Sequence, residues 1–262
     1  MEKAQAILLA SFGAVQPDVR RYCLDALADE VARTFPDYTV RQAYTSAVIR
    51  QRLAASGIFM PSLPEALLQL KAEGFHKVLV QPTHLTAGEE YENKVCRAVD
   101  QAREAFADLR LGCPVFSTGR QPRGNDAGVA ALIDGVSLRS GEAMVFMGHG
   151  SPHHHNPVYE ILQDCMASRQ LPVYIGVLEP TDTPSFETVL HCLQRDGYRQ
   201  VYLRPLLLTG GYHVMEDMAG DTPASWKSRL KAAGIVVRVS RQGLAERPDF
   251  RKLYLDHIRD LL

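Results

Sequence analysis

An internal repeat restricts the fold of this chain more than any other feature of its sequence. Residues 66–88 and 189–211 share one pattern of apolar residues, glycines and prolines at a constant offset of 123 positions. Two segments that agree in so many turn-forming residues predict two similar lobes, residues 1–124 and 125–262, joined near residues 121–126. The matched residues are Gly74 with Gly197, Pro82 with Pro205, Thr86 with Thr209, and Gly88 with Gly211.

Short apolar segments alternate with longer amphipathic segments along the whole chain. Apolar strands that alternate with helices predict an α/β fold, in which each lobe has a parallel sheet flanked by helices and a cleft separates the lobes. The predicted strands are residues 4–11, 39–44, 77–82, 109–117, 143–148, 173–178, 200–207 and 235–240. The predicted helices are residues 17–35, 63–73, 89–106, 126–135, 157–168, 185–195, 223–233 and 248–262.

Bulk properties exclude several classes of partner. The 262 residues carry a net charge of -1, so no basic excess is available for a nucleic acid, and no polybasic helix for a membrane surface. The five cysteines include no C-x-x-C pair, which indicates reduced thiols rather than a disulfide framework. The first apolar segment is too short for a secretory signal, and no segment approaches a membrane span. The sequence therefore predicts a cytoplasmic protein.

Three strand ends of the second lobe carry side chains that can bind a metal ion. His149 lies between two glycines after one strand, Glu179 follows the next strand, and His213 comes after a third strand and two more glycines. Ligands of parallel sheets bind beyond the carboxyl ends of the strands. Two imidazoles and a carboxylate suit a borderline divalent ion and leave positions open for a substrate. These three residues are therefore the predicted metal ligands.

The repeat also assigns counterparts in the first lobe. The 123-residue offset pairs His213 with Glu90, and motif position pairs His149 with Phe12. Each functional interpretation has a simpler alternative. A loop histidine is often merely solvated, Glu179 fits a surface carboxylate, and Glu90 fits the acidic first turn of a helix.

Two further histidine positions stay open. Residues 153–155 are three adjacent histidines, which fit an exposed loop because neighbouring side chains point in different directions. At most one or two of them could help to deliver metal. His84 follows a strand of the first lobe, but its counterpart in the repeat is Leu207, so the repeat gives it no role.

Several motifs spread over nearly the whole chain are specific in combination, although each is weak alone. With them the chain resembles the class II tetrapyrrole chelatases, and within these the anaerobic cobaltochelatases of cobalamin synthesis. The motifs are LLASFG at 8–13, AYTS at 43–46, His84 with GEEYE at 88–92, VFMGHG at 145–150, Glu179, PLLL at 205–208 through His213 to 217–219, and SWK at 225–227 after Gly220.

The resemblance implies the chelatase fold, a tetrapyrrole held between two lobes, and a metal bound by His149, Glu179 and His213. Related sirohydrochlorin chelatases carry Gly-His-Gly after the first strand, where this chain has Phe12 between Ser11 and Gly13. A histidine in the second lobe is shared by the anaerobic cobaltochelatases and the protohaem ferrochelatases. The Gly-His-Gly form and the short chain favour the cobalt enzyme.

Metal insertion requires that two pyrrole protons leave and that the metal ion sheds water. A histidine, with a pKa of about 6.5, can accept a proton at neutral pH. We therefore expect His149, His213 and Glu90 to act in catalysis, with release of two protons from a sirohydrochlorin-type tetrapyrrole. Co²⁺ is expected as a substrate, and no organic cofactor is expected.

The histidine and carboxylate ligands do not select cobalt by themselves, because Fe²⁺ and Ni²⁺ also fit them. One alternative is a ferrochelatase acting on sirohydrochlorin or a porphyrin. A second is a non-catalytic carrier of metal or tetrapyrrole, which would lack turnover. The expected partners are the tetrapyrrole and the metal ion. A homo-oligomer is compatible with the sequence, which defines neither the number of subunits nor the residues that bind the substrate carboxylates.

Overall fold

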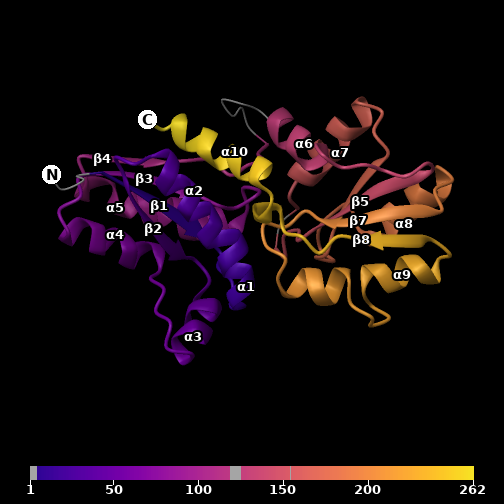
Figure 1. Ribbon diagram of the computed structural model, residues 1–262, viewed down its shortest axis with the longest axis horizontal. Helices are drawn as coiled ribbons and strands as arrows, with labels where there is room; N and C mark the ends of the chain where they lie inside the picture. Colours follow the sequence, from indigo (N-terminus) through magenta and orange to yellow (C-terminus); the bar gives the residue numbers. More distant parts are fainter. Residues whose placement is uncertain (1–4, 119–124, 154) are drawn as a thin grey trace. The chain divides into compact units, whose positions relative to one another are not determined.

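A computed structural model describes residues 5–118, 125–153 and 155–262 and divides the chain into two compact units (Figure 1). The first unit consists of Met1–Pro122 together with Ala245–Leu262, and the second is Arg123–Leu244. The predicted lobes, residues 1–124 and 125–262, differ from this division at the C-terminus. There the last eighteen positions, 245–262, belong with the first unit.

The first unit is built on a four-stranded parallel sheet with the order β2-β1-β3-β4. Its strands are β1 (Gln5–Ser11), β2 (Thr39–Tyr44), β3 (Lys77–Pro82) and β4 (Asp108–Leu111). Its helices before the crossing to the second unit are α1 (Pro17–Val19), η1 (Arg20–Asp25), α2 (Ala26–Thr34), α3 (Ala47–Ala55), α4 (Leu63–Ala72), η2 (Tyr91–Cys96), α5 (Arg97–Ala102) and η3 (Arg103–Ala105).

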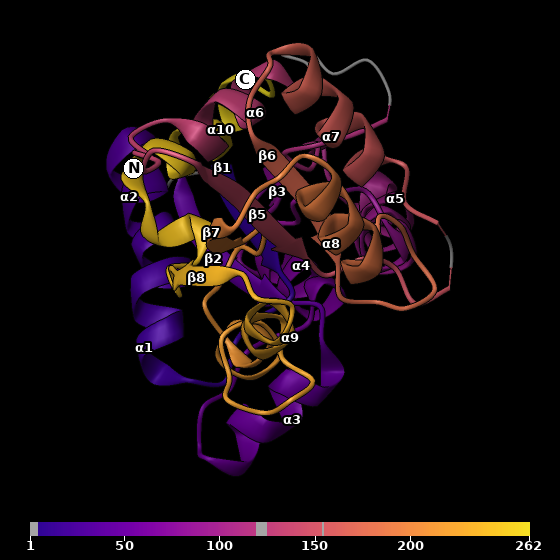
Figure 2. The ribbon, with the colours of Figure 1, turned by 90° about the vertical axis from the view of Figure 1, so that its right-hand side faces the viewer.

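The second unit repeats this plan with a parallel sheet of order β6-β5-β7-β8. Helices α6 and α7 lie on one side of the sheet and α8 and α9 on the other (Figure 1), while α7 and α8 flank the edge strand β6 (Figure 2). The elements are α6 (Asp126–Ile133), β5 (Glu142–Gly148), α7 (Val158–Ser168), β6 (Val173–Val177), α8 (Phe186–Arg195), β7 (Gln200–Pro205), η4 (His213–Met218), α9 (Trp226–Ala232) and β8 (Val236–Val239).

The repeat has the same structural role in both units, which confirms the predicted fold of two similar parallel sheets. Gly74 follows α4 with φ +87°, and Gly197 follows α8 with φ +78°. Only glycine adopts this left-handed conformation without strain, so the same turn ends both helices. Pro82 ends β3 and Pro205 ends β7, each beside a central strand of its sheet.

The C-terminal helix explains why the last residues belong to the first unit. After η5 (Leu244–Glu246), helix α10 (Pro248–Arg259) packs against β3 and α2. The buried Tyr254 donates its hydroxyl to the carbonyl of Thr83 at 2.8 Å, and Arg251 pairs with Glu30 at 2.6 Å. Helices α4 and α5 cover the opposite face of the same sheet, so α10 completes the second layer beside α2.

Some predicted elements differ from the structure. Strand β4 ends at Leu111 rather than at residue 117. Gly112 N–H still donates to Val80, but Pro114 has no N–H, and pairing resumes only as an isolated bridge between Thr86 and Phe116. The helix expected from residue 223 begins at Trp226, where the Ser225 side chain accepts the N–H of Ser228. Helix α3 was not predicted, since Leu53 is its only buried residue and no apolar stripe marks it.

Three segments of the described ranges, η1, η2 and η4, form π-helices, in which each hydrogen bond joins residues five positions apart instead of four. The sequence did not predict them. Two of them, η2 and η4, follow equivalent strands of the two sheets, and π-helices are frequent at functional sites. None of the helices in the described ranges is both long and apolar enough to cross a membrane.

Candidate metal centre

Parallel pairing between β5 and β6 continues into the loops that carry two of the predicted ligands. Leu178 N–H donates to the carbonyl of Gly148 at 3.0 Å, and Glu179 N–H donates to the carbonyl of His149 at 2.9 Å. His149 and Glu179 are therefore neighbours on adjacent strand ends. The first unit has the equivalent bond from Ser46 N–H to the carbonyl of Phe12, at 3.3 Å. This bond gives the pairing of His149 with Phe12 a structural basis.

The two glycines beside His149 are required by close packing. A side chain at Gly148 would place its Cβ 2.5 Å from the ring of Tyr159. Gly150 has φ +82° and lies against Val177 and Glu179, and its N–H donates to the Tyr159 hydroxyl at 3.2 Å. Any other residue at either position would displace the backbone that holds His149.

His213 is the first residue of the π-helix η4 and lies beside His149. The two imidazole ring centroids are 4.9 Å apart at an interplanar angle of 84°. The Nδ1 atom of His149 is 3.8 Å from Oε1 of Glu179. The three side chains keep partial solvent contact, with 41%, 25% and 44% of the side chains of His149, Glu179 and His213 exposed. The structure thus brings the three predicted ligands together in the second unit.

The hydrogen bonds of the histidines determine which ring nitrogens can act. His213 Nδ1 lies 2.7 Å from Oδ2 of Asp217, one helical turn away. His149 Nδ1 lies 3.1 Å from the carbonyl of Gly150, which can only accept. Each Nδ1 therefore carries a hydrogen in the neutral ring, and each Nε2 presents a lone pair for a metal ion or a proton.

The three side chains do not form a closed coordination shell as they stand. Within residues 5–118, 125–153 and 155–262, no group of three His, Cys, Asp or Glu side chains is arranged to hold a metal ion. Coordination of one ion by His149, Glu179 and His213 therefore requires rotation of at least one of these partly exposed side chains.

Glu90 lies in the first unit and precedes the π-helix η2, as Tyr212 precedes η4 in the second unit. Its carboxylate pairs with Nζ of Lys94 at 2.8 Å, and Lys94 also donates to the carbonyl of Thr45 at 3.5 Å. Only 27% of the Glu90 side chain is exposed. Glu90 is therefore held in place at the carboxyl end of the first sheet.

Both ring nitrogens of the nearby His84 are buried and lack a hydrogen-bond partner. Burial lowers the pKa of His84 to about 4, although the nearby charge of Glu90 acts in the opposite direction. A neutral imidazole with unsatisfied nitrogens destabilises the fold. His84 lies two residues after the end of β3, and its role stays open.

We expect His84→Leu to make the first unit more resistant to acid. The unfolded chain takes up a proton near pH 6.5, whereas folded His84 does so only near pH 4. The contribution of neutral His84 to the free energy of unfolding is therefore present in full above pH 6.5. By linkage, the free energy of unfolding falls by about 3 kcal/mol as the pH decreases to 4. Urea unfolding at pH 7 and pH 4.5 measures this loss in the wild type and the variant. The matched control is His76→Leu, at an exposed histidine of the same unit; an equal acid loss in His84→Leu would contradict the assignment.

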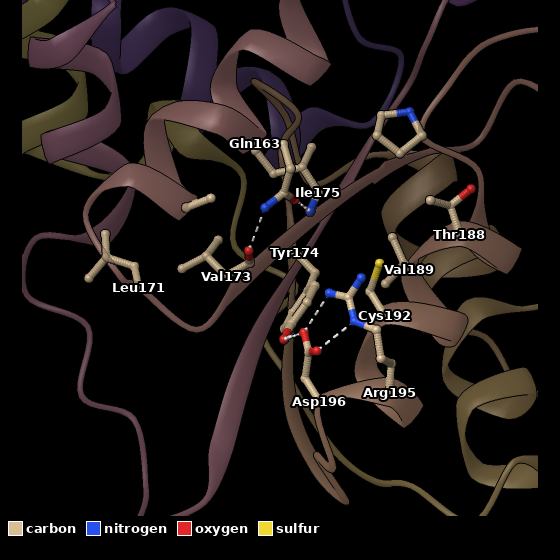
Figure 3. A pocket seen from close by; sticks show the side chains of 12 residues that line it. Gln163, Leu171, Val173, Tyr174, Ile175, Thr188, Val189, Cys192, Arg195 and Asp196 are labelled. Carbon is tan, nitrogen blue, oxygen red and sulfur yellow. Dashed lines mark hydrogen bonds and ion pairs between the residues drawn. The ribbon is translucent and has the colours of Figure 1, made fainter.

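The second unit also contains a cavity of about 320 Å³ between α7, α8 and the edge strand β6 (Figure 3). Its polar groups already have partners. Tyr174 and Arg195 both bind Asp196, and Gln163 donates to Val173 and accepts from Ile175, which satisfies backbone groups on the free edge of β6. None of the predicted site residues lines this cavity. Its lining residues stabilise the edge of the sheet and take no part in the candidate metal centre.

Two residues with a supporting role were missed in the sequence. Asp217 lies four positions after His213, a helical spacing that places the two side chains together and that could have indicated the pair. Asp182 binds the loop after β5, where it accepts the N–H groups of Ser151 and Asn156 at 2.9 and 3.0 Å. No sequence spacing indicates these contacts, because 31 and 26 positions separate the partners.

The chain is similar in sequence to known cobalt chelatases over nearly its whole length. The family described as cobalt chelatase (CbiK) matches residues 5–262. The sirohydrochlorin cobaltochelatase of Salmonella typhimurium is 34% identical over 264 residues, covering 98% of this chain and 96% of the relative. The sirohydrochlorin cobaltochelatase CbiKC of Nitratidesulfovibrio vulgaris is 35% identical over 256 residues, covering 97% and 89%.

Two solved structures show the same fold. SirB from Bacillus subtilis with Fe³⁺ has a TM-score of 0.63 at 15% identity, covering 98% of this chain and 95% of that chain. CbiX, described as the terminal enzyme for biosynthesis of sirohaem in denitrifying bacteria, has a TM-score of 0.56 at 19% identity, covering 98% and 99%. At these identities the similarity is evidence of fold alone.

Proposed function

The chain belongs to the cobalt chelatase (CbiK) family, and we propose that His149, Glu179 and His213 carry out its reaction. The reaction is the insertion of Co²⁺ into sirohydrochlorin, a step of cobalamin biosynthesis. One observation supports the residue assignment above the others. Two imidazoles with ring centroids 4.9 Å apart lie next to a carboxylate at the strand ends of one sheet.

In the proposed mechanism, the metal ion is held only moderately, because it is a substrate and must leave. His149, Glu179 and His213 replace part of its water shell and then exchange with the pyrrole nitrogens. The two pyrrole N–H protons depart as these nitrogens bind the metal. Nε2 of His149 accepts the two protons one after the other and passes each to solvent. Asp217 stabilises the orientation of His213 through its Nδ1 hydrogen bond. The reaction requires no organic cofactor.

The proposal also covers which metal ions serve as substrates and in which compartment the protein acts. Fe²⁺ and Ni²⁺ fit the same ligands and are proposed as slower substrates. A ferrochelatase acting on sirohydrochlorin or a porphyrin is the second candidate, because Fe²⁺ fits the same histidine and carboxylate ligands. None of the five cysteines, all of which lie in the described ranges, forms a disulfide, which supports a reducing, cytoplasmic setting. A homo-oligomer is compatible with the proposal.

The experiment that tests the function is a spectral insertion assay with purified protein. Sirohydrochlorin and protoporphyrin are each offered with Co²⁺, Fe²⁺ and Ni²⁺ at substoichiometric protein. We expect many turnovers with sirohydrochlorin and Co²⁺. A faster reaction with iron would move the assignment to a ferrochelatase, and at most one product per chain would identify a carrier.

We further propose that Glu90 assists proton removal or ring orientation from the first unit. Glu90→Ala is expected to slow insertion while cobalt affinity stays near that of the wild type, because the proposed ligands all lie in the second unit. A group that acts only in the transition state lowers kcat without a matching change in binding. The measurement is insertion rate beside cobalt affinity, with Glu92→Ala as an exposed control on the same helix. Lost cobalt affinity in Glu90→Ala would instead make Glu90 a ligand.

A further inference from the structure

A second pair of potential metal ligands lies outside the site described above. His155 belongs to the loop after β5, and Glu160 belongs to the first turn of α7. Nε2 of His155 is 3.3 Å from Oε2 of Glu160. The two side chains are 45% and 50% exposed, so solvent ions reach them. Neither residue takes part in the proposed insertion reaction.

The His155 ring is held by a buried carboxylate. Its Nδ1 lies 2.9 Å from Oδ1 of Asp182, whose side chain is fully buried. Asp182 is itself fixed by three backbone N–H groups, those of Ser151, Asn156 and Thr183, at 2.9 to 3.0 Å. A carboxylate that accepts the Nδ1 hydrogen is the usual support of a metal-binding histidine, because it leaves the Nε2 lone pair free and aimed.

Glu160 is oriented in the same way. Its Oε1 atom accepts the hydroxyl of Thr183 at 2.9 Å, which turns Oε2 toward His155. Both atoms of the pair are therefore lone-pair donors, and two such atoms at 3.3 Å repel each other unless a cation lies between them. A proton or a metal ion can serve as that cation.

The separation of the two atoms fits a metal ion. Bonds from a borderline divalent ion to imidazole nitrogen or carboxylate oxygen are about 2.0–2.2 Å long, so two ligands at a tetrahedral angle lie about 3.4 Å apart. The observed separation is 3.3 Å. Imidazole with carboxylate is a ligand combination that suits cobalt as well as zinc.

We propose that His155 and Glu160 form an outer binding site for a divalent metal ion such as Co²⁺, completed by water. Two protein ligands hold an ion weakly, which suits a site that loads and releases it. Asp182 connects this site to the loop of His149, because its Oδ2 accepts the N–H of Ser151. The loading role rests on the proposed insertion of Co²⁺, whereas the existence of the site does not.

The test begins with Co²⁺ alone, without tetrapyrrole. Calorimetric titration of the whole protein is expected to give two bound ions per chain, and His155→Ala or Glu160→Gln should lose one. His153→Ala, at an exposed histidine of the same loop, is the matched control and should keep both. Anomalous diffraction at the cobalt edge should place the second ion between His155 and Glu160.

One bound ion in the wild type, or a second ion that survives His155→Ala, would overturn the site and leave a proton between the two side chains. In the insertion assay, His155→Ala should raise the half-saturating Co²⁺ concentration severalfold while the rate at saturating Co²⁺ is unchanged. An unchanged half-saturating concentration would overturn the loading role. A wild type that binds two ions but inserts none would refute the proposed function and leave the outer site standing.

Discussion

His149→Ala is expected to lower the insertion rate at least about 1,000-fold, because the variant loses both a metal ligand and the proton acceptor. The two roles converge on one atom. Nδ1 of His149 is occupied by the carbonyl of Gly150, so Nε2 must meet either the metal ion or the pyrrole proton.

The rate of metallation of sirohydrochlorin, followed by absorption at saturating Co²⁺, measures this effect. His153→Ala, in the same loop, is the control and should stay near the wild-type rate. Added imidazole should restore part of the activity of His149→Ala if proton acceptance is the missing function. Turnover close to the wild type in His149→Ala would refute the mechanism.

His213→Ala should reduce turnover by more than about 100-fold and weaken cobalt binding as well. The comparison with Asp217→Asn separates the ligand from its support. A neutral amide cannot hold the imidazole as firmly as the carboxylate at 2.7 Å, and loss of such support typically costs 10- to 100-fold in affinity or activity. We therefore expect Asp217→Asn to have a smaller effect than His213→Ala in the same direction.

Glu216→Gln, at an exposed position of the same π-helix, controls for general disturbance of the helix. Cobalt affinity by calorimetry and insertion rate by absorption are both required. If His213→Ala binds cobalt normally and only kcat falls, His213 acts on the protons and not on the metal. If Asp217→Asn has the larger effect, the carboxylate itself is the ligand.

The proximity of His149 and Glu179 could be inferred from sequence because parallel strands bring their carboxyl ends to one edge. The alternation of apolar strands and helices was sufficient for that step, and the repeat identified the equivalent strands. The position of His213 was predicted for the same reason. The predicted strand ends were therefore enough to place these side chains on one edge, while the order of the strands, β6-β5-β7-β8, was not predicted.

Other features depend on contacts that no local pattern describes. Asp182 looks like an ordinary loop aspartate until the fold brings it to backbone groups 26 and 31 positions away. The π-helical turn that begins at His213 differs from an α-helix by one residue in hydrogen bonding, which apolar periodicity does not resolve. An amphipathic pattern at residues 248–262 predicts a helix, but it does not say which of two sheets that helix covers.

The pairing of α10 with the first sheet has a consequence for the order of events during synthesis. The sequence of the second unit, residues 123–244, is translated before residues 245–262, which belong to the first unit. Until then, the layer of the first sheet that includes α2 lacks α10, and apolar residues that α10 buries stay uncovered. Exposed apolar surface of this kind promotes aggregation of nascent chains. The second unit is thus complete in one continuous segment, while the first depends on residues 245–262, which are translated after the second unit.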